Sequence, residues 1–515
     1  MSQGLFAALY GQGRPFALID TRERRDHVNG HWFGSINIPL SGLTDDIARM
    51  IPDREFPLHL LDWQDAASAA AADRLSQLGY DQVTLCPTAL PDAFGHGFVK
   101  GEYVWSKAFG EVVAHECGLP ELTPADYLAH HADAMLFDVR PTAEYRQFTI
   151  PGSQSLPNSL LLANMAALTE TGRMALLHCA GRTRSIIGAC TLKAAGYDGP
   201  FAIFRGGTQA WQLDGYEREH QADRLFATEQ DSRDEVHAFL ARWDIPFEAV
   251  GDEGLAAFVA AHQSSHLFDV SDDAATGQRL TPGIIRISGT NLIQQTDRSI
   301  ARYHVPVILF DHGSGSRAAF AAYWLKLMGF AVCVVYLDSR LSVAASEAGV
   351  NQDIAVTSVV LSEEALMAHQ DKGGDIFDFR PSQHYRCGHL RGSVWQNISG
   401  VLADETSLAP PANPAAIIGQ NVEHAAEVAA MLESHDWPIS GLYGWDRGDL
   451  DGASIDQGKL DNPVDESNLF AGRHYGNMQD SRDYLAWEED LPGQIDRPLH
   501  DLWHRLLTAA FQTWR

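Results

Sequence analysis

Residues 174–182 read Met-Ala-Leu-Leu-His-Cys-Ala-Gly-Arg, an apolar run that reaches Cys179 and opens into a turn with a glycine. An Ala-containing segment with helical spacing follows and ends at Gly196. Earlier in the chain, another apolar run, Leu-Phe-Asp-Val-Arg, occupies residues 136–140. Short apolar strands that alternate with helices are typical of a parallel sheet covered by helices on both faces. This stretch therefore predicts an α/β fold.

The same pattern occurs four times along the 515 residues. In each copy a first apolar run ends in an aspartate, at Asp20, Asp138, Asp269 and Asp378. A second run follows 42, 41, 42 and 41 residues later, at Asp62, Cys179, Asp311 and Gly419. Each copy then continues into a helical segment and a third apolar run. A repeat at a fixed period indicates tandem structural units, so we predict four of them, each a doubly wound, mainly parallel sheet with helices on both faces.

The length of the chain agrees with four units of about 100 residues each. We predict domains at residues 1–100, 120–225, 245–345 and 360–455, followed by a C-terminal extension at 456–515. Linkers are expected near residues 100–120, 225–245 and 345–360. The extension breaks the repeat and ends in an amphipathic segment, so we expect it to pack on the domains.

Composition excludes several classes of protein. The formal net charge of −29 argues against binding to nucleic acid or to an anionic membrane surface, because both need a basic face. No apolar run approaches the ~20 residues of a spanning helix, and the N-terminal stretch lacks a signal-peptide pattern. The six cysteines are scattered and form no CxxC pair, so we expect no disulfide framework and no metal. We predict a cytoplasmic protein without a cofactor.

Only the second copy carries a reactive side chain where its second strand meets the following helix. We expect the strand to deliver Cys179 to the carboxyl edge of the sheet, where open α/β sheets bind ligands. A short loop with Gly181 would surround the sulfur with backbone N–H groups, and Arg182 and Arg184 would add positive charge. These features stabilise a thiolate and attract an anion. Ser185 would cap a helix that begins at Ile186.

The second copy resembles the rhodanese domain. The resemblance lies in Asp138-Val139-Arg140 with Glu144-Tyr145, Pro151-Gly152-Ser153, the loop at 179–185 and the closing segment Arg205–Trp211. The other three copies resemble the same domain with inactive loops, at Asp62, Asp311 and Gly419.

The resemblance implies a sulfurtransferase in which Cys179 takes the outer sulfur of a donor such as thiosulfate or glutathione persulfide. The resulting persulfide passes its sulfur to cyanide or to a thiol. Substrate would be bound by the loop residues Ala180, Gly181, Arg182, Thr183 and Arg184. Structural support would come from Asp138, Arg140 and Ser185.

One position departs from the family. Some two-domain members hold the donor with an arginine outside the loop, and the equivalent residue here is Glu144. Anion binding would then rest on the loop alone.

Two alternative functions remain open. Cys179 could be a redox sensor or a sulfur carrier without turnover, since reactive cysteines serve either purpose. A phosphatase of the same fold is less favoured, because Arg184 is five residues after Cys179 whereas phosphatase loops need six. We expect small-molecule substrates, no nucleic-acid or membrane partner, and inactive copies that serve packing, homodimerisation or shaping of the cleft.

Overall fold

The computed structural model describes residues 4–91, 93–130, 132–226, 232–272, 276–280, 283–338, 341, 359–403, 410–447 and 455–512. Most of the predicted linker at 345–360 lies outside these residues, as does part of the linker at 225–245.

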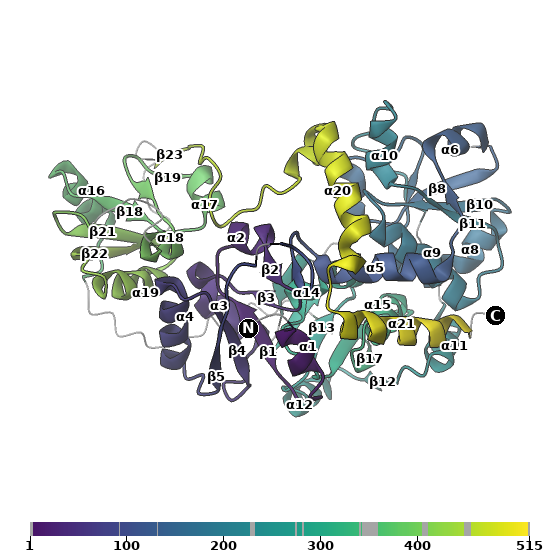
Figure 1. Cartoon of the computed structure of the whole chain (residues 1–515), viewed down its shortest axis with the longest axis horizontal. Helices are drawn as coiled ribbons and strands as arrows, with labels where there is room; N and C mark the ends of the chain where they lie inside the picture. Colours follow the sequence, from purple (N-terminus) through teal and green to yellow (C-terminus); the bar gives the residue numbers. More distant parts are fainter. Residues whose placement is uncertain are drawn as a thin grey trace.

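Four larger sheets form the framework of the described residues (Figure 1). Sheet 1 has the strand order β3 (Ile36–Asn37), β1 (Ala17–Asp20), β4 (Leu58–Asp62) and β5 (Val83–Pro87). Sheet 2 has the order β9 (Gln154–Ser155), β8 (Ala134–Asp138), β10 (Met174–His178), β11 (Phe201–Phe204) and β7 (Glu121–Leu122). Sheet 3 has the order β14 (Thr276–Arg279), β15 (Ile284–Ile287), β13 (His266–Asp269), β16 (Val307–Asp311), β17 (Val332–Leu337) and β12 (Phe247–Val250). Sheet 4 has the order β20 (Val394–Trp395), β18 (Ile376–Asp378), β21 (Ala415–Gly419) and β22 (Ile439–Gly444).

The four sheets share their central order. In each, the strand that carries the first aspartate pairs in parallel with the strand that leads to Asp62, Cys179, Asp311 or Gly419. Only β14 runs antiparallel to its neighbour in these sheets of the described chain. Central strands such as β16 are buried along their whole length, which explains their continuous apolar sequence. The predicted fold class is confirmed: mixed α/β, with mainly parallel sheets flanked by helices.

Two short ribbons complete the strands, β2 (His31–Trp32) with β6 (Phe98–Val99) and β19 (His389–Leu390) with β23 (Ile455–Asp456). Around sheet 1 lie α1 (Leu5–Tyr10), α2 (Arg24–Asn29), η1 (Leu40–Gly42), α3 (Leu43–Met50) and α4 (Ala66–Gln77). The helices of the second copy are α6 (Pro124–His130), α7 (Thr142–Gln147), η2 (Asn158–Leu160), η3 (Leu162–Asn164), α8 (Met165–Glu170), α9 (Thr183–Ala195) and α10 (Gly207–Leu213).

The helices of the third copy are α11 (Arg233–Arg242), α12 (Leu255–Ala261), α13 (Gly289–Gln294), α14 (Thr296–Ser299) and α15 (Ser316–Leu327). Those of the fourth are α16 (Glu363–Asp371), α17 (Ser382–Cys387), α18 (Ile398–Leu402), α19 (Val422–Glu433) and η4 (Trp445–Arg447). The extension forms η6 (Ala471–Tyr475), α20 (Met478–Asp490), η7 (Leu491–Gly493) and α21 (Arg497–Gln512).

The predicted linker at 100–120 is the buried helix α5 (Val104–Cys117), which lies at the centre of the molecule. Its Trp105 and Phe109 rings meet Trp503 of α21 edge-on, with centroids 5.4 and 5.2 Å apart. Such aromatic pairs add to the stabilisation from apolar burial. The extension therefore packs on the other units, as expected from its sequence, and in Figure 1 its yellow helices run beside α5.

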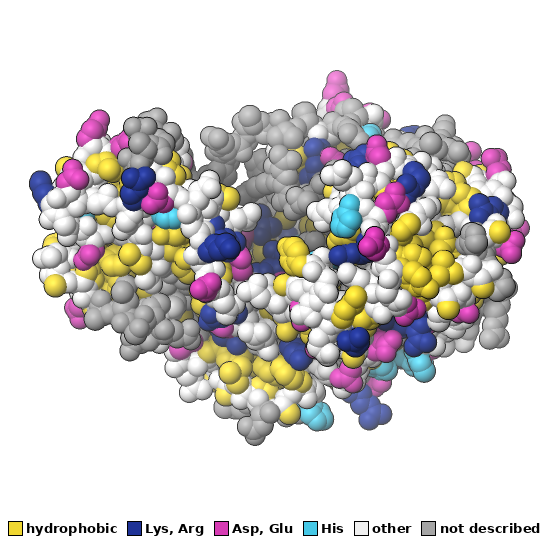
Figure 2. Space-filling view, turned by 90° about the horizontal axis from the view of Figure 1, so that it is seen from above, with side chains coloured by type: hydrophobic (Ala, Val, Ile, Leu, Met, Phe, Trp, Pro, Cys, Tyr) yellow, Lys and Arg dark blue, Asp and Glu magenta, His cyan; other side chains and the backbone are white. Residues whose placement is uncertain are grey.

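The larger apolar cores extend over more than one sheet. One core contains Ile19 of sheet 1 together with Phe377 and Ile417 of sheet 4. Another contains Leu18 of sheet 1, Leu177 of sheet 2 and Leu309 of sheet 3. Seen from above, the surface is hollowed between the sheet 4 lobe and the main body, and dark blue Lys and Arg side chains are visible in the hollow (Figure 2).

Candidate active site

Cys179 directly follows the last residue of β10, and α9 begins four residues later at Thr183. The sequence predicted that this helix begins at Ile186 with Ser185 as its cap, and that prediction is wrong. Ser185 lies in the first turn, where its hydroxyl donates to the carbonyl of Arg182 at 2.7 Å. The same hydroxyl is 3.9 Å from the Cys179 sulfur. Ser185 thus contacts the thiol while closing the turn.

The segment after β11 holds the carbonyl groups of the Cys179 loop. The N–H of Thr208 donates to the Cys179 carbonyl at 3.0 Å, and the N–H of Gln209 to the Ala180 carbonyl at 3.1 Å. Gly207 makes this contact possible, because a Cβ there would lie 2.2 Å from the Cys179 oxygen. Its φ of 53° also favours glycine. The loop carbonyls are therefore turned toward residues 206–209.

The loop N–H groups point the other way. In a trans peptide the N–H is opposite to the preceding C=O, so the N–H groups of Ala180 and Gly181 face away from residues 206–209. In the part of the chain that the structure describes, the N–H groups of Ala180, Gly181, Arg182 and Arg184 have no hydrogen-bond acceptor. They lie at the N-terminus of α9, whose dipole favours negative charge. This arrangement is suited to bind an anion.

Asp138 and Arg140 brace the turn beside the loop. The Asp138 carboxylate accepts from Arg140 N–H at 3.1 Å, Nε at 2.9 Å and Nη2 at 2.7 Å, and it also accepts from the Thr149 hydroxyl at 2.8 Å. Arg140 donates in turn to the carbonyl of Phe148. Burial acts to raise the pKa of Asp138, but the charges of Arg140 and His178 and the hydrogen bonds from Arg140 and Thr149 together hold that pKa well below its ordinary value. Both side chains are buried, so they hold the loop rather than meet solvent.

The two loop arginines have carboxylate partners from distant segments. Arg182 makes a bidentate pair with Glu111 of α5, at 2.9 and 3.1 Å. Arg184 donates to Glu144 at 2.7 Å. Burial by itself lowers the pKa of Arg184, but the charge and hydrogen bond of Glu144, together with the nearby Cys179 and Tyr484, raise it above its ordinary value. The positive charge that the sequence assigned to the loop is thus largely compensated.

A cavity of about 270 Å³ lies against the loop. Ala180 and Arg184 line it, whereas Gly181, Arg182 and Thr183 do not. The Arg182 side chain, paired with Glu111, holds α5 against the loop. Cys179 does not line the cavity either, and it is only 2% exposed. Ala180, which follows Cys179 in the chain, brings the cavity to the loop.

Several residues around the loop carried no signal in the sequence. Glu488 of α20 is buried, and its carboxylate accepts from the hydroxyl and N–H of Thr183 and from Lys107 at 3.3 Å. Tyr484 of α20 and Gln294 of α13 line the cavity. They come from regions far from Cys179 in the chain, so local pattern could not find them. Gly207 had a signal, the Gly-Gly pair after the third strand.

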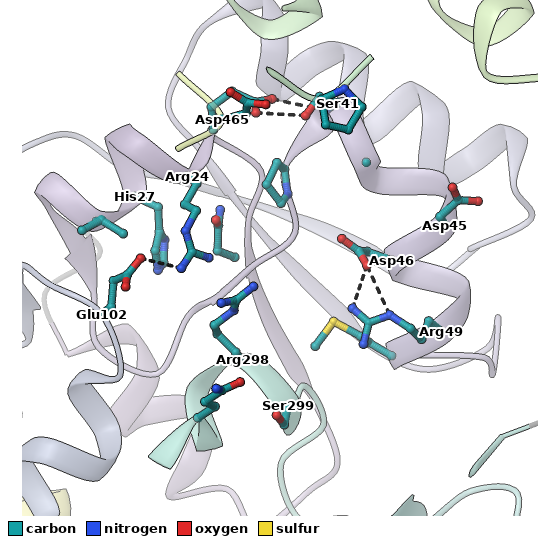
Figure 3. Close-up of a pocket in the computed structure, with 18 of the residues that line it drawn as sticks. Arg24, His27, Ser41, Asp45, Asp46, Arg49, Glu102, Arg298, Ser299 and Asp465 are labelled. Carbon is teal, nitrogen blue, oxygen red and sulfur yellow. Dashed lines mark hydrogen bonds and ion pairs between the residues drawn. The ribbon is translucent and has the colours of Figure 1, made fainter. Parts of the chain in front are cut away.

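A second cavity of about 710 Å³ lies between sheets 1, 3 and 4 (Figure 3). In it Arg24 is paired with Glu102, and Arg49 with Asp46 at 2.6 Å. This second cavity lies away from the Cys179 loop, and none of its lining residues belongs to that loop. Across the described ranges no group of three or more His, Cys, Asp or Glu side chains is arranged to bind a metal. The helices described include none that is both long and apolar enough to cross a bilayer.

Comparison with known proteins agrees with this geometry. Residues 123–214 match the profile of the rhodanese-like domain. No curated protein matches the chain. The thiosulfate sulfurtransferase from Pseudomonas aeruginosa is similar over 96% of this chain and 97% of its own, with 27% identity and a TM-score of 0.79.

Two further solved structures match shorter parts. A protein of unknown function, a possible tyrosine phosphatase from Rhodopseudomonas palustris, is 27% identical over 21% of this chain and 91% of its own, with a TM-score of 0.19. The 3-mercaptopyruvate sulfotransferase of Escherichia coli is 18% identical over 43% of this chain and 99% of its own, with a TM-score of 0.22. We base no argument on these two. Residues 123–214 thus match a rhodanese-like domain, and the fold of the chain is similar to that of the Pseudomonas thiosulfate sulfurtransferase.

Proposed function

We propose that the protein is a thiosulfate sulfurtransferase that carries sulfane sulfur on Cys179. One observation carries the proposal: the thiol lies at the N-terminus of α9, in a loop whose N–H groups have no acceptor among the described residues. The likeness to the Pseudomonas thiosulfate sulfurtransferase over nearly the whole of both chains supports it.

In the first half-reaction the Cys179 thiolate attacks the outer sulfur of thiosulfate. A new S–S bond forms, the bond between the outer and central sulfur atoms breaks, and sulfite leaves with the electron pair. The terminal sulfur of the persulfide then carries the negative charge. The N–H groups of Ala180, Gly181, Arg182 and Arg184 lie where they can donate to that charge.

In the second half-reaction an acceptor attacks the terminal sulfur. Cyanide leaves as thiocyanate, or a thiolate such as that of glutathione leaves as its persulfide, and the Cys179 thiolate is restored. The thiolate form of the enzyme reacts with the donor, and the persulfide form reacts with the acceptor. Because the enzyme alternates between these two forms, ping-pong kinetics are expected. A related donor such as glutathione persulfide would enter the same cycle.

Mass spectrometry of the intact protein tests the proposal. Incubation with thiosulfate should add the mass of one sulfur atom to Cys179, release one equivalent of sulfite and be reversed by cyanide. If thiosulfate leaves the mass unchanged, the sulfurtransferase is refuted. Oxidation of Cys179 by hydrogen peroxide without any persulfide would instead favour a redox sensor. Release of phosphate from p-nitrophenyl phosphate would indicate a phosphatase.

We also propose a cellular location, partners and a domain organisation for the enzyme. We place the enzyme in the cytoplasm, because its cysteines form no disulfide framework. Its partners would be small molecules, with neither nucleic acid nor membrane, and a homodimer is compatible with the sequence. We further propose that each of the four larger sheets belongs to one of the domains predicted at 1–100, 120–225, 245–345 and 360–455.

A further inference from the structure

The C-terminal extension forms part of the wall of the Cys179 cavity. Its contributions are Leu469, Phe470, Arg473, His474, Tyr484 and Trp487. On the opposite side the cavity is lined by the loop residues Ala180 and Arg184. The extension is held there because α20 packs on α5 and α10. A segment outside the rhodanese-like domain thus reaches its reactive loop.

Most charged groups of this cavity are already compensated. Lys107 donates to Tyr484 and lies 3.3 Å from the buried Glu488 carboxylate. Arg184 is paired with Glu144. Glu102, the other acidic residue of the lining, is paired with Arg24. None of these groups offers a free charge to a ligand.

Arg473 differs from them. Its Nη1 donates to the carbonyl of Phe470 at 2.7 Å, and its guanidinium lies over the Tyr484 ring, 4.6 Å from the centroid. Both contacts fix the side chain without neutralising it. Within the described ranges Arg473 has no carboxylate within ion-pair distance. Its Nε and Nη2 groups have no acceptor in those ranges either.

The positive charge of Arg473 also affects the pKa of the neighbouring His474. Burial, together with Arg473, Arg218 and Arg140, lowers the pKa of His474 to about 4. The imidazole is therefore neutral near pH 7 and adds no cation of its own. Among the described residues that line the cavity, Arg473 is therefore the cation without a carboxylate partner.

We propose that Arg473 is the residue that holds the anionic end of the sulfur donor above the Cys179 loop. The inference rests on the proposed function and deepens it, because it assigns the donor site partly to the C-terminal extension. A guanidinium suits the sulfonate end of thiosulfate, since it presents several N–H donors in one plane. Glu144 and Arg184 neutralise one another, so the loop needs a charge from outside.

Alkylation of Cys179 tests the role of Arg473 without any sulfur chemistry. Iodoacetate and iodoacetamide react alike, since the thiolate displaces iodide from each, but only iodoacetate is an anion. In the wild type the cavity should favour iodoacetate. Arg473→Gln should lower the ratio of the iodoacetate rate to the iodoacetamide rate about tenfold or more, as expected for loss of a charge-assisted contact. Peptide mass spectrometry restricts the measurement to Cys179, and Cys179→Ser gives the background.

Two variants serve as controls. Arg473→Lys keeps the charge and should retain most of the ratio. Arg482→Gln removes an exposed arginine from α20, the helix that follows η6 in the same extension, and should leave the ratio unchanged. If Arg473→Gln and Arg482→Gln give the same ratio as the wild type, or if neither reagent reaches Cys179, the proposal is overturned.

Steady-state kinetics provide a second readout. Arg473→Gln should raise the KM for thiosulfate about 10–100-fold with little change in kcat, because the contact is made to the donor before reaction. An unchanged KM contradicts the assignment. Failure of the proposed function looks different: thiosulfate would then add no sulfur to the wild type, while the alkylation ratio would still depend on Arg473.

Discussion

Cys179 in sheet 2 and Asp311 in sheet 3 occupy equivalent places, yet their loops use their N–H groups in opposite ways. Asp311 ends β16 and is fully buried. Its carboxylate accepts from the N–H groups of His312 at 2.8 Å, Arg317 at 3.1 Å and Ala318 at 3.2 Å. Around Cys179 the N–H groups of Ala180, Gly181, Arg182 and Arg184 have no acceptor among the described residues. One loop binds its own anion, and the other remains available for a ligand.

The difference teaches how one scaffold can lose its chemistry without losing its fold. In the Asp311 loop a carboxylate of the chain satisfies the helix N-terminus, which an isolated loop would leave to water or a ligand. In the fourth copy the equivalent position is Gly419, which has no side chain. A Cβ at Gly419 would lie 2.5 Å from the backbone nitrogen of Ala425, so no side chain fits there at all. At both positions the backbone thus forms an ordered junction without a cysteine.

The largest expected effect is on sulfite release, which should depend on Cys179 but not on Asp311. Cys179→Ser should reduce sulfite release from thiosulfate by about a thousandfold or more, because the persulfide cannot form. Asp311→Asn should leave the rate within about twofold, because that residue is in another sheet. Residual turnover in Cys179→Ser comparable to the wild type would show that the nucleophile is elsewhere.

A second prediction concerns the carbonyl contacts that distinguish the Cys179 loop. Gly207→Ala should lower kcat/KM about 100-fold, since the new Cβ would displace the Cys179 carbonyl and rotate the loop N–H groups. Gly215→Ala is the matched control. Gly215 also has a positive φ, of 88°, but a Cβ there would meet nothing within 4 Å. Equal losses in both variants would mean that backbone strain alone matters, not the contact with Cys179.

The third prediction concerns the free energy of unfolding, which should depend more on Asp311 than on Cys179. Asp311→Ala should destabilise the protein by about 2–4 kcal/mol, because three buried N–H groups lose their acceptor. Asp311→Asn should cost less, since one side-chain oxygen remains. Cys179→Ala should cost about 1 kcal/mol or less, because the thiol bonds no backbone N–H. Urea unfolding followed by tryptophan fluorescence measures all three. If Cys179→Ala proves as costly as Asp311→Ala, the two loops do not differ in the way described.

The smallest expected effect concerns pH in the region of Cys179. The folded-state pKa of Asp138 is held below its ordinary value, so the ionised carboxylate stabilises the fold. This contribution is present above the ordinary pKa of about 4 and is lost as pH falls below it. Asp138→Asn should therefore destabilise the protein by about 1–2 kcal/mol at pH 7 and by less at pH 3.

Thermal unfolding of the wild type and Asp138→Asn at both pH values checks the trend. Asp223→Asn is the control, because Asp223 is paired with Arg146 at the surface and both side chains are largely exposed. Its effect should stay small at either pH. A difference between wild type and Asp138→Asn that grows on acidification would contradict the sign of the shift.

The sequence by itself determined the repeat, the mainly parallel sheets and the position of the thiol. These follow from apolar runs at a constant separation and from one cysteine at a strand end, and such signals are local. In each of the four larger sheets the strand with the first aspartate pairs in parallel with the strand that leads to the second position of the pattern. The start of α9 was misplaced by three residues, because helix ends depend on which N–H groups find partners.

Only the tertiary structure decided which charges are available. Arg182 and Arg184 read as free cations in the sequence, yet Glu111 and Glu144 compensate them across the fold. The third copy lacks an arginine two residues after Asp269, but Arg286 of β15 donates to that carboxylate at 2.8 Å. The electrostatic environment of a group depends on residues brought near it by folding, whatever their separation along the chain. That is why the loop could be found by pattern, whereas the acidic partners of its arginines and the role of Arg473 could not.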